Sequence, residues 1–209
     1  MKARMIITLL LICISCKDDL KSRYDNVYLE KLLIIAKKSI LDQYENRRYD
    51  GFVFINNSGD DIGIALRIIE DGNKERGCIA FIKGAIPLER SVGYAAINAA
   101  FFDERFKPVG ENDFDKLYLE VSVFGKFSRM RDFNDFKLGK ESVMVNNYMK
   151  KAIIQAQIAT EEKDDKEHYL ERICIKAGME PDEYTKKGVI LLKSKTVFLR
   201  KKFSEINIE

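Results

Sequence analysis

The residues best suited to chemistry stand together in the stretch Glu75-Arg76-Gly77-Cys78-Ile79-Ala80-Phe81. Cys78 is a candidate nucleophile, but a thiolate needs a nearby base or a positive field to form at neutral pH. Arg76 lies two positions away and would share a strand face with Cys78. The one histidine, His168, falls on the polar side of an expected helix, so a Cys–His pair would require the fold to bring the two together. Catalysis, lining of a binding site and a buried structural role stay open for Cys78, and its apolar surroundings favour the buried role.

Three charged residues interrupt otherwise apolar blocks, namely Arg76, Arg105 and Glu120. Arginine suits phosphate or carboxylate because its planar guanidinium donates in pairs. In a second interpretation, Arg105 forms an ion pair with the neighbouring Asp103. Glu120 is a candidate general base alongside Cys78, although the alternation of its strand favours a solvent-facing position. The expected anion-binding residues are Arg76, Gly77, Cys78 and Arg105.

The sequence predicts no cofactor and no nucleic-acid partner. Cys78, Cys174 and His168 lack the paired spacing of a zinc site, and neither a Gly-x-x-x-x-Gly-Lys nor a Gly-x-Gly-x-x-Gly motif occurs. A net charge of +3 over 209 residues gives no global field. The lysine-rich stretch 186–202 is typical of solvated edge strands, with contact to anionic headgroups left open. A Cys78–Cys174 disulfide also stays open, since spacing alone cannot give its geometry.

The elements that must position these residues alternate between helix and strand. Hydrophobic residues make up 46% of the chain, which is enough for a core. Leucines and small residues at helical spacing predict a helix over 27–48. The clean alternation of 117–123 predicts a strand with one buried face. Further elements expected in this half are strands at 51–56, 62–70 and 76–82 and a helix over 87–102.

The second half is expected to be more broken. Asp164 or Asp165 could cap a helix that Gly178 would end. The other expectations are an irregular stretch at 127–138, a short strand at 142–145, a helix at 148–160, and final strands at 189–193 and 196–203. Together, residues 27–209 are expected to form one α+β domain.

The first residues have the pattern of an export signal. Residues 1–15 combine a basic start with a short apolar run, too short to span a bilayer as a stable helix. Ser15-Cys16 at its end resembles a bacterial lipobox, although Cys13 stands where leucine is more usual. We therefore expect an exported protein lipidated at Cys16 and anchored to the bacterial membrane, with 16–26 as a polar tether. An ordinary cleaved signal, an uncleaved anchor and an apolar start on a cytoplasmic protein are the alternatives.

The stretch Arg76-Gly77-Cys78-Ile79 resembles the signature of the AMMECR family, and the resemblance runs from Tyr28 to Glu205. Three later blocks agree in order: Asp103…Arg105-Phe106…Pro108, Leu119-Glu120-Val121-Ser122-Val123, and Lys176-Ala177-Gly178. The resemblance implies an α+β fold of two unequal, intertwined lobes with a cleft between them. It also implies an association with Memo-like and radical-SAM partners in bacterial relatives.

The chain departs from the family pattern at the positions whose residue types are best suited to catalysis. Ala80 replaces a glycine, and Gly139-Lys140-Glu141-Ser142 lacks the histidine and second glycine of a Gly-x-His-Gly element. The segment 154–159 lacks the proline of a Leu-Pro-Gln-Val-Ala-like run, and the chain has no tryptophan. These losses favour a domain that binds a small ligand or a protein partner without catalysis. The alternative is an enzyme acting on a small anionic substrate in a cleft lined by the Arg-Gly-Cys-Ile segment.

Overall fold

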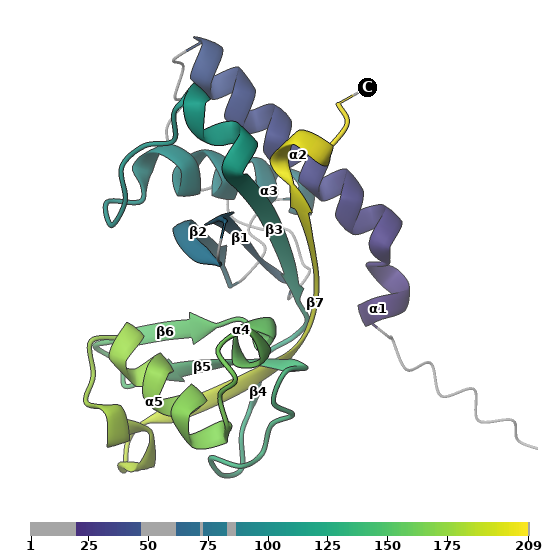
Figure 1. The fold of residues 1–209 in the computed structure, drawn as a ribbon. Helices are drawn as coiled ribbons and strands as arrows, with labels where there is room; N and C mark the ends of the chain where they lie inside the picture. Colours follow the sequence, from purple (N-terminus) through teal and green to yellow (C-terminus); the bar gives the residue numbers. More distant parts are fainter. Residues whose placement is uncertain (1–19, 47–61, 72, 83–86, 209) are drawn as a thin grey trace, which may run out of the picture.

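In the part of the chain that the structure describes, two lobes share one seven-stranded antiparallel sheet (Figure 1). The computed structural model describes residues 20–46, 62–71, 73–82 and 87–208. The expected leader and the expected strand at 51–56 lie outside these residues. The strands follow the order β2-β1-β3-β7-β5-β6, with β4 paired to β7. This arrangement confirms the α+β class.

The first lobe packs helices on one face of a four-stranded sheet. Its strands are β2 (Lys74–Phe81), β1 (Gly63–Glu70), β3 (Leu117–Phe124) and the second half of β7 (Ile190–Lys202). Its helices are α1 (Leu20–Arg23), α2 (Asn26–Asn46), α3 (Leu88–Ile97), the π-helical turn η1 (Asn98–Phe102), and the 3-10 turns η2 (Glu111–Lys116) and η4 (Phe203–Glu205).

The apolar spacing of α2 determines how that helix lies on the sheet. Leu29, Leu32, Leu33, Ala36 and Ile40 are each at most 2% exposed and belong to the core of the first lobe. This confirms the predicted helix and its buried face. Because α1 precedes α2 directly, part of the stretch expected as a tether is folded, and Tyr24 between the two helices is buried.

The second lobe is smaller and has its own core. Its strands are β4 (Ser128–Arg129), β5 (Glu141–Asn146), β6 (Lys151–Ile154) and the first half of β7. Its helices are α4 (Ala156–Glu161), α5 (Lys166–Lys176) and the 3-10 turn η3 (Pro181–Thr185). Asp165 caps α5 by accepting from the backbone N–H of His168 at 2.9 Å, and Gly178 follows with φ of 70°. Both ends of α5 are therefore as predicted.

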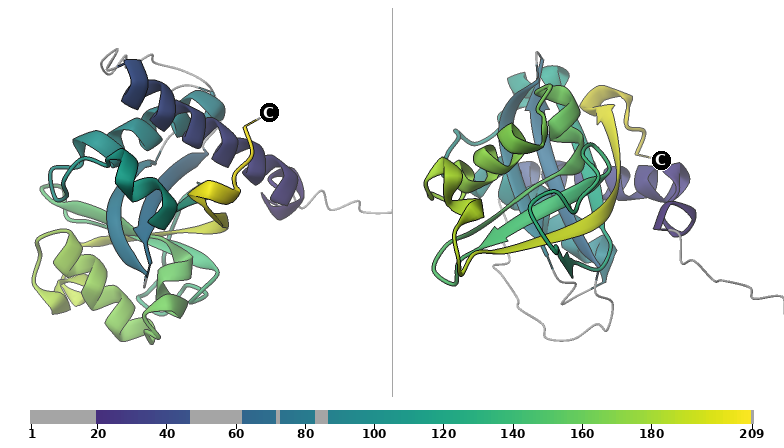
Figure 2. Two further views of the ribbon diagram at one scale, coloured as in Figure 1. Left: turned by 45° about the horizontal axis from the view of Figure 1, so that its top comes forward. Right: turned by 90° about the horizontal axis from the view of Figure 1, so that it is seen from below.

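Two predicted boundaries are wrong. The helix expected over 148–160 is split into β6 and α4, because Ile153 and Ile154 are buried as β6 pairs with β5. The strands expected at 189–193 and 196–203 form one continuous strand, β7. Figure 2 shows β7 curving from one lobe to the other. Its residues 190–195 pair with β5 and its residues 196–202 pair with β3.

The expectation of one buried face for β3 is also wrong. Seven of its eight residues are buried, so both faces are covered. Helices α2 and α3 cover one face, and α4 of the second lobe reaches the other through Gln157. A small apolar cluster of Ala65, Phe124, Met144 and Ile153 joins the lobes. Among the described residues, no helix is both long and apolar enough to cross a membrane.

Candidate functional site

Gly77 is placed in β2 against the π-helical turn η1. A Cβ at Gly77 would lie 2.0 Å from the carbonyl oxygen of Ala99 and 2.8 Å from its carbonyl carbon. No side chain fits there, so glycine is required for β2 to pack against η1. This is the close backbone approach that the sequence suggested, and the approaching group is part of the chain itself.

Arg76 and Arg105, the two arginines expected to bind an anion, contact different residues. The Arg76 guanidinium donates to the Lys107 carbonyl at 2.8 Å and lies 3.5 Å from the Asp113 carboxylate. It does not line the cleft described below. Arg105 does line that cleft, and it pairs with Asp103 at 2.7 Å. The expected Asp103–Arg105 ion pair is thus confirmed.

Asp103 links this ion pair to Cys78. Its carboxylate accepts from the backbone N–H of Cys78 at 3.0 Å and from Arg105 Nε at 2.9 Å. Burial acts to raise the pKa of Asp103, but the hydrogen bonds from Arg105 and Cys78 outweigh it and hold that pKa below its ordinary value. The ion pair with Asp103 in turn raises the pKa of Arg105, and a further pair with Glu75 at 3.0 Å contributes.

Cys78 is a thiol in an environment that opposes its ionisation. Burial raises the pKa of the Cys78 thiol, and the nearby cations Lys176 and Arg67 do not reverse this. Its side-chain hydrogen-bond partner is Gln155, whose Nε2 lies 3.3 Å from Sγ. His168 instead pairs with Asp165 at 3.0 Å, with 69% of its side chain exposed. Both described cysteines, Cys78 and Cys174, are free, so the possible disulfide is not formed.

Glu120 is buried at 1% exposure, and the expected solvent-facing position is wrong. Its Oε2 accepts from Arg200 at 2.7 and 2.9 Å. Its Oε1 accepts from Gln157 at 2.8 Å and lies 3.3 Å from Arg67 Nε. Both oxygens are engaged, so the geometry describes a structural carboxylate rather than a free general base. The alternation of β3 could not reveal this, because the second lobe supplies the cover.

The charged groups around Glu120 connect the lobes. Arg67 of β1 donates to Glu161 of α4 at 2.6 Å, and Arg200 of β7 pairs with the same carboxylate. Gln157 of α4 also donates to Ser122 of β3 at 2.9 Å. The sequence prediction missed all these partners. One signal was available: Arg67 stands alone among the apolar residues of 62–69.

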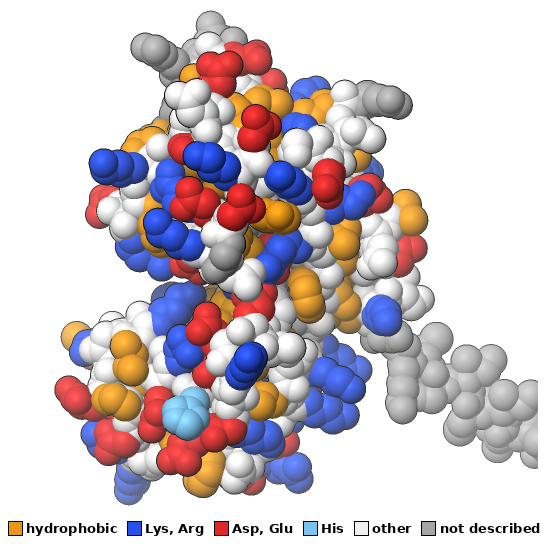
Figure 3. All heavy atoms as spheres, viewed as in Figure 1, with side chains coloured by type: hydrophobic (Ala, Val, Ile, Leu, Met, Phe, Trp, Pro, Cys, Tyr) orange, Lys and Arg blue, Asp and Glu red, His pale blue; other side chains and the backbone are white. Residues whose placement is uncertain are grey.

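A cleft of about 190 Å³ opens beside this network, between the lobes. Figure 3 shows charged side chains of both signs on the two sides of the groove that separates the lobes. Four cations line the cleft: Arg67 and Arg105 from the first lobe, and Arg172 and Lys176 from the second. The lining carboxylates are Glu75, Glu161 and Glu162.

The cations differ in how fully they are neutralised. Arg172 pairs with Asp164 at 3.1 Å and with Glu162 at 3.5 Å. Lys176, at the end of α5, is exposed and has no ion-pair partner among the described residues. The same part of the chain holds no cluster of three or more His, Cys, Asp or Glu side chains suited to a metal ion. A larger pocket of about 400 Å³ lies beside α1, and it shares no lining residue with the cleft.

Helices packed on a curled antiparallel sheet, with a charged cleft between two lobes, define a class of α+β domain. The AMMECR1 family profile matches residues 27–195, and the chain belongs to this family. A solved structure of the same fold is that of the uncharacterized protein PH0010 from Pyrococcus horikoshii. It superposes with a TM-score of 0.75 at 22% identity, over 85% of this chain and 93% of that one.

Archaeal proteins are among the relatives in sequence. Protein SSO0193 of Saccharolobus solfataricus is 31% identical over 169 residues, which are 75% of this chain and 74% of that protein. A protein of Sulfolobus acidocaldarius is 28% identical over 79% of this chain and 69% of its own length. A protein of Sulfurisphaera tokodaii is 33% identical over 60% of this chain, and the match spans 57% of that protein.

Proposed function

We propose that this AMMECR1 domain binds a small anionic molecule in the cleft between its lobes and performs no chemistry on it. The observation that carries the proposal is the convergence of four cationic side chains from both lobes on one cleft. Arginine and lysine side chains brought together in a partly enclosed site favour carboxylate or phosphate groups.

The size of the cleft limits the ligand. Its volume of about 190 Å³ is below the range of roughly 300–1,000 Å³ typical of sites for drug-sized molecules. We therefore expect a ligand of few heavy atoms, such as a short carboxylic acid or a phosphate monoester. Lys176 is the residue expected to contact its anionic group, because no described carboxylate pairs with it.

Binding is favoured over catalysis by the state of Cys78. An activated cysteine has a lowered pKa, whereas burial raises the pKa of this one. The enzyme alternative requires the thiolate, and Glu120, the other candidate, has both carboxylate oxygens occupied. Fast reaction of native Cys78 with a thiol reagent at neutral pH would instead support the enzyme alternative.

The proposal is tested by titrating the full chain with inorganic phosphate and with acetate, followed by amide chemical shifts. We expect shifts at Glu75, Arg105 and Lys176, and a loss of affinity of about tenfold in Lys176→Ala, since a hydrogen bond to a charged group is worth about 1.5 kcal/mol. Lys187→Ala is the matched control, because Lys187 is exposed in the same lobe and does not line the cleft. Equal affinities in the two variants would refute the site.

We also propose that the protein is exported and anchored to a membrane through lipid on Cys16. The basic start, the apolar run and Ser15-Cys16 support this. The intact mass of the protein from its own cells, and its partition into detergent, provide the test. A mature chain that begins at a diacylated Cys16 is expected, and Cys16→Ser should leave an unmodified chain. An unprocessed wild-type chain in the aqueous phase would support the cytoplasmic alternative.

A further inference from the structure

The cations that line the cleft between the lobes differ in what they leave for a ligand. Each of the three lining arginines, Arg67, Arg105 and Arg172, already pairs with two carboxylates at 3.5 Å or less. Lys176 pairs with no carboxylate among the described residues, and its side chain is exposed. The anionic group of a ligand is therefore expected at Lys176, and a single lysine suits a single carboxylate.

The charge around the cleft as a whole argues against a ligand that is only negative. The carboxylates that pair with the lining arginines number six, and Arg200 pairs with two of the same six. With Arg200 and Lys176 included, five cations face six carboxylates. A purely anionic ligand adds to this excess of negative charge, whereas a ligand that carries one charge of each sign does not.

Glu162 is the lining carboxylate with the most capacity for a second partner. Among the described residues its carboxylate contacts Arg172 at 3.5 Å, which is long for a charge-assisted hydrogen bond, and 47% of its side chain is exposed. Arg172 is better matched by Asp164, whose two oxygens each accept from it at 3.1 Å. Glu162 can therefore accept from a cationic group of a ligand while Arg172 keeps its partner.

The positions of Glu162 and Lys176 suit a short zwitterion. Arg172 and Lys176 are one turn apart on α5, about 6 Å along the same face of the helix, and Glu162 lies beside Arg172. The ammonium nitrogen and the carboxylate carbon of an α-amino acid are about 2.5 Å apart. With a charge-assisted hydrogen bond of about 2.8 Å at each end, such a molecule bridges roughly 8 Å between two charged side chains.

The remaining lining of the second lobe is apolar. Ile154 ends β6 and is buried, and Ile158 of α4 is half-buried. Both belong to the same lobe as Glu162 and Lys176. The cleft volume of about 190 Å³ leaves room for a small aliphatic group against them.

We propose that the cleft binds a free α-amino acid with a small aliphatic side chain. Its carboxylate contacts Lys176, its ammonium group contacts Glu162, and its side chain packs on Ile154 and Ile158. This inference rests on the proposed anion site, and it identifies the anionic group as one end of a zwitterion.

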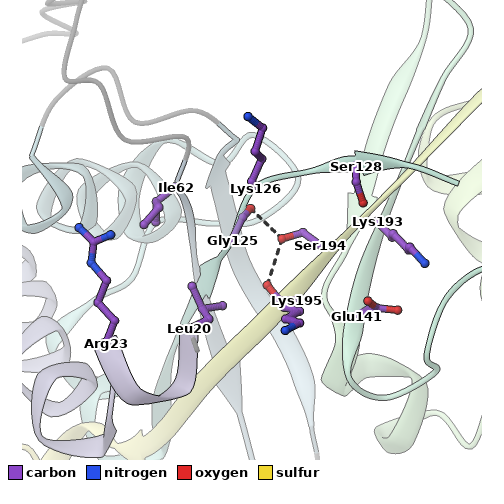
Figure 4. A pocket seen from close by; sticks show the side chains of 10 residues that line it. All are labelled: Leu20, Arg23, Ile62, Gly125, Lys126, Ser128, Glu141, Lys193, Ser194 and Lys195. Atoms are coloured by element: carbon purple, nitrogen blue, oxygen red, sulfur yellow. Dashed lines mark hydrogen bonds between the residues drawn. The ribbon is translucent and has the colours of Figure 1, made fainter. Parts of the chain in front are cut away.

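The larger pocket beside α1 does not offer this pair of charges (Figure 4). In the part of the chain that the structure describes, its lining holds one carboxylate, Glu141, which lies on the side of Lys193 and accepts from the backbone N–H of Lys137 at 2.7 Å. Lys193 itself pairs with Asp135 at 2.7 Å. The amide of Gly125, which lines this pocket, therefore serves as a reporter of unspecific binding.

The test titrates the full chain at neutral pH with three probes of one carbon skeleton. These are L-valine, 3-methylbutanoate, which lacks the ammonium group, and 2-methylpropylamine, which lacks the carboxylate. Amide chemical shifts are followed at Glu75, Arg105 and Lys176, with Gly125 as the reporter outside the cleft. We expect L-valine to bind about fivefold more tightly than 3-methylbutanoate, the upper range for an ion pair at a partly exposed carboxylate. The amine should cause no saturable shift.

Glu162→Gln should abolish the preference for L-valine and leave the affinity for 3-methylbutanoate unchanged. Glu167→Gln is the matched control, because Glu167 is exposed in the same lobe and does not line the cleft. A preference for L-valine that survives Glu162→Gln would overturn the assigned contact with the ammonium group. So would a preference that is lost equally in Glu167→Gln.

The two proposals for the cleft fail in different ways. Equal affinities for L-valine and 3-methylbutanoate, both reduced in Lys176→Ala, would overturn the amino acid and leave the anion site in place. The absence of saturable shifts with both probes would overturn the two proposals together. Shifts of similar size at Gly125 and at Lys176 would show unspecific binding and would also overturn both.

Discussion

Replacement of Gly77 by alanine tests the packing that underlies the signature stretch. A Cβ at this position would lie 2.0 Å from the Ala99 carbonyl oxygen, whereas carbon–oxygen contacts are normally about 3.3 Å or longer. Either β2 or η1 must therefore move by more than about 1 Å. Gly77 is not among the glycines with positive φ, so the effect is steric and not one of backbone dihedral strain.

The expected loss of stability for Gly77→Ala is about 3 kcal/mol, the upper end for overpacking, because backbone atoms on both sides resist the shift. At roughly 2–4 °C per kcal/mol for a domain of this size, the Tm should fall by about 6–12 °C. Differential scanning calorimetry and urea unfolding measure both quantities. We also expect faster labelling of Cys78, which follows Gly77 directly.

Gly110→Ala is the matched control for this variant. Gly110 has φ of −110°, and the nearest atom to its added Cβ is a side-chain oxygen of Asp113 at 3.8 Å. Its stability should change by less than about 0.5 kcal/mol. If Gly77→Ala unfolds at the same temperature as Gly110→Ala, the close contact between β2 and η1 does not exist in solution and the reasoning fails.

Three further predictions concern the buried charges and the thiol. Glu120→Gln should lower the free energy of unfolding in urea by about 3–5 kcal/mol, because two guanidinium groups lose their shared carboxylate. The control Glu205→Gln, at an exposed position, should leave the free energy of unfolding nearly unchanged. Similar values for the two variants would show that the charged groups around Glu120 are solvated. Native Cys78 should react slowly with a thiol reagent at pH 7, because burial raises the pKa of its thiol. The reaction should become faster only at a pH above the ordinary pKa of a thiol. A reaction rate at pH 7 above that of a free thiol would contradict this prediction. Since the folded pKa of Asp103 is lowered, its contribution to stability is present above about pH 4 and is lost as the pH falls below that value. Asp103→Asn should therefore flatten the acid side of the stability profile, and an unchanged profile would contradict the assigned hydrogen bonds.

Local patterns were sufficient to predict the elements whose ends and faces depend on nearby residues. The spacing of Leu29 to Ile40 gave the buried face of α2, and Asp165 and Gly178 gave both ends of α5. These predictions hold because capping and helical periodicity act within a few residues. The family resemblance supplied what such patterns cannot, the two-lobed arrangement.

The candidate site depended on contacts across the lobes and was predicted only in part. Arg105 lies at the cleft and Asp103 pairs with it, as the sequence suggested. Glu120 was assigned to solvent because the cover comes from Gln157, which lies 37 residues further along the chain, beyond the reach of any strand pattern. The partner residue Arg67 was visible only as a lone charge in an apolar strand.

The continuity of β7 has a consequence for how the chain folds as it is synthesised. Its 13 residues supply an edge to β3 in one lobe and to β5 in the other. The described helices and hairpins that precede residue 190 can form on the ribosome, but neither half of the sheet is complete until residues 190–202 have emerged. Neither core can be completed before β7 has been synthesised, and the unpaired edges of β3 and β5 both stay exposed until then. A stop codon before residue 190 would therefore remove both lobes at once and leave no folded half.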